Sequence, residues 1–382
     1  MESYDKEINE EETEGATPKD EKLLNKKLYI ALISFAVSIL IYVAARLFPL
    51  FAEFWTRYPA QWIRFILAKI TGFIPFSLAE CIIIALPIVM VAYILGSIIS
   101  TRKDETNAGI NRWTRPMIAI VLALGIVFCL GFGPAFGRKP ISENLGLESM
   151  PVSAEELYDT AKIISETAYF ELDDITFGVD GASVMPYSYK ELVGKMNDAF
   201  GKYAGEVDYI SHYNSNPKAI ALSEPMTYTH ISGVYTFMTG ESNVNVNYPD
   251  FLLPYTMAHE MAHQRGIARE DEANFVAYLV CIGSDDAYIR YSGYANMLNY
   301  LLPALSEADG EKRVELIKNV LPKEIYSEFI AYSQFFDKYR GSTASVVTEK
   351  ISDVMIKTHG QPAGTKSYGL VVDLAVAYYK SR

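Results

Sequence analysis

Two histidines and a glutamate form the stretch of this sequence with the clearest capacity for chemistry. His259, Glu260 and His263 follow the pattern H-E-x-x-H. Residues four apart share one face of an α-helix, so His259 and His263 can direct two imidazoles at one metal ion. Glu260 then lies beside the ion without binding it, where it can hold a water molecule and take its proton. The pattern predicts a zinc site with Glu260 as general base, and a coincidental match on a surface helix is the less favoured alternative.

A zinc ion held by two histidines needs a third protein ligand and an open position for water. The helix with the two histidines is expected to be short, because Pro254 suits a first helical turn and Gly266 suits a stop. A second helical run follows over 269–279, and its first turn contains the carboxylates of Glu270 and Glu272. Both carboxylates are candidates on these grounds.

The order E-x-E-A-N-x-x-A-x-x-L in this second run resembles the second-helix signature of gluzincin-type metallopeptidases, including that of ImmA/IrrE-like peptidases. In that signature the ligand precedes the asparagine by four positions, so the resemblance implies Glu270 as the third zinc ligand, with Glu272 as the fallback. It also implies that Asn274 orients a ligand through a hydrogen bond. The sequence departs from the metzincins, whose third ligand would fall at Arg269, a residue that cannot bind zinc.

Three long apolar runs precede this region, at about 28–50, 78–99 and 116–136. Each is long enough to cross a hydrocarbon core of about 30 Å. Their charged flanks favour membrane spans over buried core helices. The segment between the first two runs, 51–77, contains two tryptophans and is predicted to be an interfacial helix pair or loop.

These runs divide the chain into three parts. Residues 1–27 are acidic and polar and are predicted to be a disordered cytoplasmic tail. Residues 28–136 are predicted to be a membrane domain with three transmembrane helices, and residues 137–382 an extracytoplasmic zincin-like domain. Lysine and arginine are more numerous on the tail side of the spans, which predicts a multi-pass protein of the cytoplasmic membrane with its N-terminus inside.

The expected fold class is α+β, mostly α, with short strand-like runs at 219–223 and 234–238. A segment in which asparagine and valine alternate follows them, which is typical of a half-buried strand. In zincins an edge strand precedes the metal helix and binds the substrate as an added strand. Asn243 and Asn245 are therefore weak candidates for substrate contact, and an asparagine-rich surface hairpin is the alternative.

Three motifs resemble an uncharacterised bacterial membrane family known as domain of unknown function thirty-eight-ten: T-G-E-x-N-V-N, L-P-Y-T-x-A-H-E-M-A-H-Q-R-G-x-A-R-E-D-E-A-N-F and K-S-Y-G. The resemblance covers nearly the whole chain and implies a zincin-like site in a membrane-anchored outer domain. It also makes Tyr368 a candidate oxyanion donor, with core packing as the alternative. His230, shortly before the expected edge strand, is another weak candidate for that role, and a hydrogen-bonded surface histidine is its alternative.

Two classes of function are compatible with these residues. The first is a zinc metallopeptidase that uses zinc-activated water to hydrolyse an amide bond in a peptide, protein or cell-wall substrate. The second is a non-catalytic zinc-binding sensor or ligand-binding membrane protein. The intact His–Glu–His–Glu set favours the enzyme, since a binding protein does not need Glu260 as a general base. The net charge of −12 gives no basic surface for nucleic acid; the expected surroundings are membrane lipids and a membrane partner protein.

Overall fold

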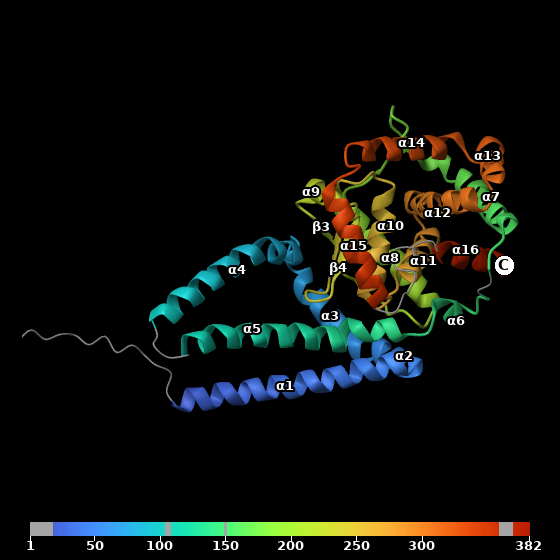
Figure 1. Ribbon diagram of the computed structural model, residues 1–382. Helices are drawn as coiled ribbons and strands as arrows, with labels where there is room; N and C mark the ends of the chain where they lie inside the picture. Colours follow the sequence, from blue (N-terminus) through green and yellow to red (C-terminus); the bar gives the residue numbers. More distant parts are fainter. Residues whose placement is uncertain (1–17, 104–107, 149–150, 359–369) are drawn as a thin grey trace, which may run out of the picture.

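The structure is a computed structural model that describes residues 18–103, 108–148, 151–358 and 370–382. Most of the described residues lie in helices, and the strands are short. Long helices project from a rounder body that contains the H-E-x-x-H residues (Figure 1). The mostly helical part of the predicted fold class is therefore confirmed.

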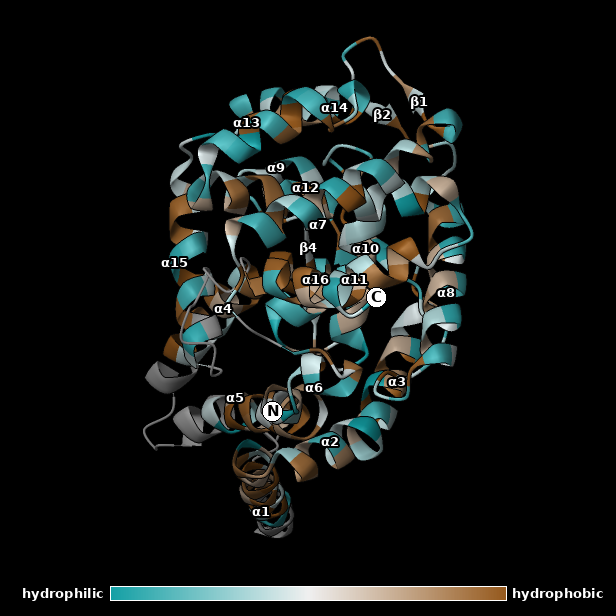
Figure 2. Ribbon diagram, turned by 90° about the vertical axis from the view of Figure 1, so that its right-hand side faces the viewer, coloured by the Kyte–Doolittle hydropathy of each residue, from teal (hydrophilic) through white to brown (hydrophobic). Residues whose placement is uncertain are grey.

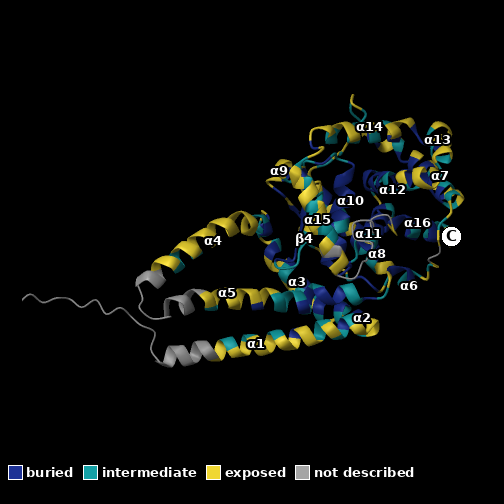
Figure 3. Cartoon of the chain, viewed as in Figure 1, coloured by how far each residue is buried: buried dark blue, intermediate teal, exposed yellow. Residues whose placement is uncertain are grey.

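Three apolar helical segments are long enough to cross a membrane, and their bounds are Lys26–Leu47, Leu78–Ile99 and Thr114–Gly137. They belong to α1, to α4, and to α5 with the π-helical turn η1 and the 3-10 turn η2 that continue it. The bounds of these elements are α1 Pro18–Leu47, α4 Leu78–Lys103, α5 Ala108–Val127, η1 Phe128–Phe132 and η2 Gly133–Gly137. Many apolar side chains on these helices are exposed, as expected of surfaces that face lipid (Figures 2 and 3).

The first helix is longer than its apolar run. It begins at Pro18, within the segment 1–27 that the sequence predicted to be a disordered tail. Residues 1–17 lie outside the described residues. Helix formation over 18–27 follows from continuity, because a helix that has already begun gains a hydrogen bond for each further residue.

The predicted pair of helices between the first two spans is present as α2 (Pro49–Arg57) and α3 (Pro59–Gly72). Each begins with a proline at a position where the missing N–H has no helical partner in any case. The pair lies next to the rounder body, whereas α1 begins, α4 ends and α5 begins at the distant end of the three long helices (Figure 1). The body and the α2–α3 pair therefore lie on the same side of the three apolar segments.

The remaining helices build the rounder body. Capping boxes at Ser153 and Ser188 start α7 and α8, and the Asp286 and Asp309 carboxylates accept hydrogen bonds at the starts of α12 and α13. The bounds are α6 Ile141–Leu145, α7 Ala154–Tyr169, η3 Leu172–Asp174, α8 Tyr189–Glu206, α9 Ser223–Thr227, α10 Leu252–Gln264, α11 Glu270–Ile282, α12 Ala287–Ala308, α13 Gly310–Asn319, α14 Lys323–Asp337, α15 Thr343–Thr358 and α16 Leu370–Lys380.

The strands form two small sheets. One is the antiparallel pair of β1 (Thr176–Phe177) and β2 (Ser183–Val184). The other has the order β3-β5-β4, in which β5 is parallel to β3 and antiparallel to β4; the bounds are β3 Lys218–Ala219, β4 Gly233–Thr236 and β5 Glu241–Val244. The asparagine–valine segment lies in and directly after β5, so its prediction as the edge strand is wrong. Alternating side chains indicate a strand, but the order of strands in a sheet depends on contacts far apart in the sequence.

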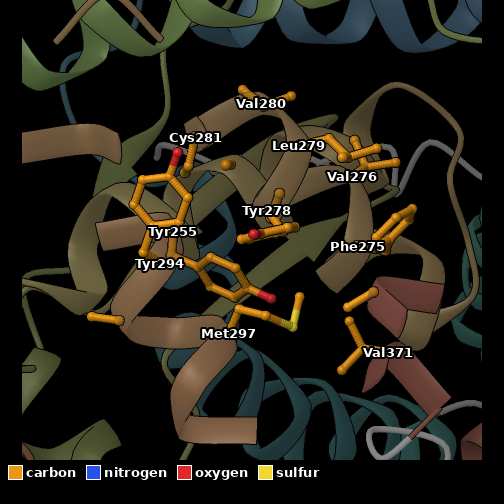
Figure 4. Close-up of a cluster of buried hydrophobic side chains, with 14 of the residues drawn as sticks. Tyr255, Phe275, Val276, Tyr278, Leu279, Val280, Cys281, Tyr294, Met297 and Val371 are labelled. Atoms are coloured by element: carbon orange, nitrogen blue, oxygen red, sulfur yellow. The ribbon is translucent and has the colours of Figure 1, made fainter. Parts of the chain in front are cut away.

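The core of the body lies around α10, α11 and α12. Nearly every residue of α10 is buried, and Tyr255 on this helix packs in a cluster with side chains of α11, α12 and α16 (Figure 4). The Tyr255 hydroxyl donates a hydrogen bond to the Asn274 carbonyl of α11 at 2.9 Å. The core therefore fixes α10 and α11 against each other, and these helices contain every residue of the predicted zinc site.

A buried ion pair joins the end of the third apolar segment to α2. Arg138 donates hydrogen bonds from Nε and Nη2 to the two carboxylate oxygens of Glu53, each at 3.0 Å. Both side chains are almost fully buried. The guanidinium group also donates to the carbonyl oxygens of Tyr209 at 2.8 Å and Gly266 at 3.1 Å. Arg138 thus connects the apolar helices with the body.

We expect Arg138→Ala to destabilise the protein, because removing one member of a buried ion pair leaves an uncompensated charge and costs about 3–5 kcal/mol. The measurement is the melting temperature of the full chain in detergent. Lys139→Ala is the matched control, because its ion pair with Glu143 is exposed and contributes about 0–1 kcal/mol. Equal melting temperatures of the two variants would contradict this role of Arg138.

Candidate metal centre

The helix with the two histidines begins and ends close to the predicted positions. Pro254 lies in the first turn of α10, and the chain leaves the helix after Gln264. Gly266 has a φ of 88°, a left-handed conformation that favours glycine, and a Cβ there would lie 2.7 Å from Nη2 of Arg64. This tight stop lets α11 begin at Glu270, a few residues later, beside the same face of α10.

Three side chains converge at the junction of α10 and α11. The Nε2 atoms of His259 and His263 are 2.9 Å apart, and they lie 3.3 Å and 3.6 Å from the carboxylate oxygens of Glu270. Tetrahedral zinc with bonds of about 2.0–2.2 Å requires neighbouring donor atoms to be about 3.3–3.6 Å apart. The two distances from the imidazole nitrogens to Glu270 match this range, whereas the 2.9 Å between the two Nε2 atoms is shorter. The three donors converge on one point, so a small separation of the imidazoles would fit them to a zinc ion.

A hydrogen bond fixes the orientation of one of the two imidazoles. Nδ1 of His263 lies 2.7 Å from the carbonyl oxygen of Ile267. Because a carbonyl only accepts hydrogen bonds, Nδ1 must hold a proton, and Nε2 is the nitrogen that can bind a metal once it has lost its own proton. The ring of Phe132, from η1, packs against the His263 ring with centroids 6.3 Å apart. His259 presents Nε2 to the same point, and its Nδ1 is buried without a hydrogen-bond partner among the described residues.

Glu272, the fallback ligand, and Asn274, the residue expected to orient a ligand, do not contact the three converging side chains through any hydrogen bond in the described residues. Glu272 faces away from the cluster: its Oε1 accepts hydrogen bonds from the Ile141 N–H and from Arg269, both at 2.9 Å. Asn274 lies one helical turn after Glu270, but its Nδ2 atom is buried without a hydrogen-bond partner among the described residues. The structure thus brings together His259, His263 and Glu270, and it gives Glu272 a structural contact instead.

The Glu260 carboxylate lies beside the cluster and against strand β4. It is 4 % exposed, and a Cβ on Gly233 of β4 would lie 2.6 Å from its Oε1. The backbone N–H of Tyr235 donates a hydrogen bond to the carboxylate. Oε2 is buried without a hydrogen-bond partner in the described part of the chain. A glycine at 233 is therefore required for β4 to approach Glu260 this closely, and one carboxylate oxygen keeps its capacity to accept a proton.

Burial and neighbouring charges act in opposite directions on these groups. Burial raises the pKa of Glu260 to about 7, against the opposing effect of His259 and His263. Burial alone would lower the pKa of His263, but the Glu270 carboxylate outweighs it and raises the pKa to about 9. Burial alone would raise the pKa of Glu270, but the two histidines hold it well below its usual range. Glu270 is therefore a carboxylate at neutral pH, which is the form that binds a metal.

The weak candidates for substrate contact, Asn243, Asn245 and His230, have hydrogen-bond partners within the body. Asn243 donates from Nδ2 to the Val234 carbonyl at 3.1 Å, and Asn245 donates to Thr227 Oγ1 and the Ile231 carbonyl, both at 3.1 Å.

Both asparagine side chains are buried and hold the strand and its loops together. His230, in a left-handed conformation, contacts the Tyr339 carbonyl at 3.1 Å and the ring of Phe336. Tyr368 lies outside the described residues.

Residues of the site that the sequence did not indicate are Phe132, Gly233 and Tyr235. Phe132 belongs to an apolar run, and its type alone gives no reason to place it against a metal ligand. Gly233 precedes a strand-like run, where a glycine can mark a close approach of backbone to another group. That signal identifies a tight position but not the carboxylate that occupies it.

The fold and the site together define a mostly helical protein with three candidate membrane-spanning helices and a His–His–Glu cluster beside a buried glutamate. The sequence matches the family described as protein of unknown function (DUF3810) over residues 55–376, and the chain belongs to this family. No curated protein and no solved structure matches the chain.

We expect the full chain to bind one zinc ion, and Glu270→Ala to lose it because that substitution removes one of three converging donors. Glu272→Ala is the matched control. It should keep its zinc and lose about 1–3 kcal/mol of stability, since the N–H of Ile141 is left without its acceptor. Metal analysis of the purified variants decides between them. Full zinc in Glu270→Ala together with loss in Glu272→Ala would assign the third ligand to Glu272.

Proposed function

We propose that this protein is a membrane-anchored, zinc-dependent metallopeptidase that hydrolyses peptide or amide bonds outside the cytoplasmic membrane. The observation that carries the proposal is that three potential metal ligands converge beside a second carboxylate, that of Glu260, which is not one of the ligands. His259, His263 and Glu270 can hold the ion. Glu260 is buried beside them against β4, which supports the role of general base. A protein that only bound zinc would gain nothing from burying Glu260, because an unpaired carboxylate is costly to bury.

Each residue has a distinct role in this proposal. A zinc ion, when bound, would polarise the scissile carbonyl and a water molecule. Glu260 accepts the proton of that water and returns it to the leaving amine. The pKa of about 7 that burial gives this carboxyl group suits a group that must both accept and donate a proton near neutral pH. The side chains of His259 and Glu270 are 14 % and 20 % exposed, so a substrate can reach the ligands.

The edge strand β4 supports a peptide as the substrate. Ser232 and Val234 face β5, since the Asn245 N–H donates to the Ser232 carbonyl and Val234 pairs with Asn243. Backbone groups alternate in direction along a strand, so those of Gly233 and Tyr235 point to the other edge, where Glu260 lies. The Tyr235 N–H already donates to Glu260, so an extended peptide can add to this edge through the remaining backbone groups, with its scissile bond beside Glu260.

The proposed orientation places the N-terminus in the cytoplasm and the site outside. The excess of lysine and arginine at the distant end of the three helices supports it. We expect a reporter enzyme that is active only outside the cytoplasm to be inactive when fused after Lys103 and active when fused after Arg382. The reverse pattern would place the site in the cytoplasm.

We expect Glu260→Gln to abolish hydrolysis while zinc and fold are retained. The amide nearly matches the carboxylate in size, so the contact with Gly233 survives, but it cannot take a proton from water. General-base catalysis is worth about 10²–10⁴ in rate, and the loss should be at least that large. The measurement is digestion of a mixed-sequence peptide library by the zinc-loaded full chain, read by mass spectrometry, with and without a chelator.

His259→Ala is the companion variant, because it should lose both zinc and hydrolysis. If wild type and Glu260→Gln digest the library at the same rate, Glu260 is not the general base. No digestion by zinc-loaded wild type, with zinc bound and the fold intact, would favour the non-catalytic zinc-binding alternative.

A further inference from the structure

The candidate metal centre lies directly against the third apolar segment. Phe132 belongs to the apolar segment Thr114–Gly137, yet its ring contacts the His263 ring and lies 5.1 Å from the ring of Tyr235. Arg64 of α3 donates one hydrogen bond to the Gly131 carbonyl at 2.8 Å and another to the Arg265 carbonyl, next to the metal helix, at 3.5 Å. A residue of a candidate membrane span thus touches a zinc ligand, with no intervening layer of protein.

Strand β4 leads from Glu260 towards the apolar helices. At its start, Gly233 touches the Glu260 carboxylate. Just past its end, the ring of Phe237 packs on Phe128, with centroids 5.2 Å apart. Phe128 lies further inside the third apolar segment than Phe132 does. An extended chain on the edge of β4 opposite β5 would therefore have one end at the Glu260 carboxylate and the other end directed towards the apolar helices.

The turn between β4 and β5 is fixed to α3 and to the start of α4. Gly240, with a φ of 69°, lies so close to α3 that a Cβ there would be 2.6 Å from the Leu67 side chain. The next residue, Glu241, accepts hydrogen bonds from the Leu78 and Ala79 N–H groups at 3.1 Å and 2.9 Å, at the start of α4. In return, the Glu80 side chain accepts hydrogen bonds from two backbone N–H groups shortly after β3. The hairpin turn and the segment after β3 are therefore both fixed relative to the start of α4.

From this arrangement we propose that the substrates are membrane-anchored proteins, cleaved in the extended segment next to the bilayer. The inference rests on the proposed peptidase function and adds the substrate class. A segment that leaves the bilayer beside the third span would meet the outer edge of β4 first and reach Glu260 after a few residues. Gly233 lies beside Glu260 and Phe237 beside Phe128, so the scissile bond should lie only a few extended residues from the anchor. Tethering to the same membrane also raises the effective concentration of the substrate.

The test uses the full chain in liposomes, loaded with zinc, together with a single-span probe protein. The probe consists of a membrane helix joined to tandem copies of one unstructured, mixed-sequence peptide. One version has the helix before the copies and another has it after them, because a strand can add to an edge in either direction. The same tandem peptide without a helix is the soluble probe, and Glu260→Gln in matched liposomes is the inactive control. Cleavage positions are read by mass spectrometry.

We expect cleavage in the copy nearest the helix in at least one anchored version, at a rate at least about tenfold above that of the distal copies and of the soluble probe. If tethering to the membrane were the only cause of faster cleavage, all copies of the flexible peptide would be cleaved. Cleavage restricted to the copy nearest the helix would instead show that the site reaches only the segment next to the bilayer. Equal cleavage of near and distal copies, or equal cleavage of the soluble probe, would overturn the membrane-anchored substrate class and leave the peptidase proposal standing. Cleavage of neither probe by wild type would overturn both.

Discussion

The chain directly after α10 is held by two buried guanidinium groups, one from α3 and one that follows the third apolar segment. Carbonyl oxygens at and just beyond a helix end have no helical N–H partner. Arg64 of α3 donates to the Arg265 carbonyl, and Arg138 after η2 donates to the Gly266 carbonyl. A buried guanidinium group is costly unless its donors are satisfied, and Arg64 also donates to the Thr56 and Gly131 carbonyls, while Arg138 pairs with Glu53. The end of the helix that contains the histidines is consequently held by residues that also contact α2 and the third apolar segment.

The parts of the site that sequence could predict are those that depend on local geometry. Two histidines four residues apart must share a helix face, and a glycine three residues later permits the left-handed stop that Gly266 adopts. Glu270 is near enough in sequence for a short connection to bring it back to the same point. The choice between Glu270 and Glu272 followed only from resemblance to a peptidase signature, because both lie in the first turn of α11 and the direction of each side chain depends on how that helix packs.

The features that could not be predicted depend on contacts far apart in the sequence. Alternating asparagine and valine predicted a strand with one polar face in solvent. Asn243 and Asn245 are instead buried, because their amide nitrogens satisfy carbonyl oxygens of β4 and the preceding loop. The edge strand beside Glu260 is instead β4, whose four residues show a weaker alternation of apolar and polar side chains. Phe132 could not be distinguished from lipid-facing residues of its run, since apolar composition is the same whether a side chain meets lipid or a histidine ring.

The boundary between residues 136 and 137, placed where the apolar run ends, does not coincide with a break in packing. Gly240 and Phe237 of the hairpin lie against α3 and η1, and Glu241 holds the start of α4. The family match extends over 55–376 and so includes α3, two of the three apolar segments and the body. Without the membrane helices, the hairpin would lose the surfaces that hold its turn, and β4 would lose the support that keeps it beside Glu260. Because general-base catalysis depends on placement at hydrogen-bond distance, the membrane helices belong to the candidate site as much as the H-E-x-x-H helix does.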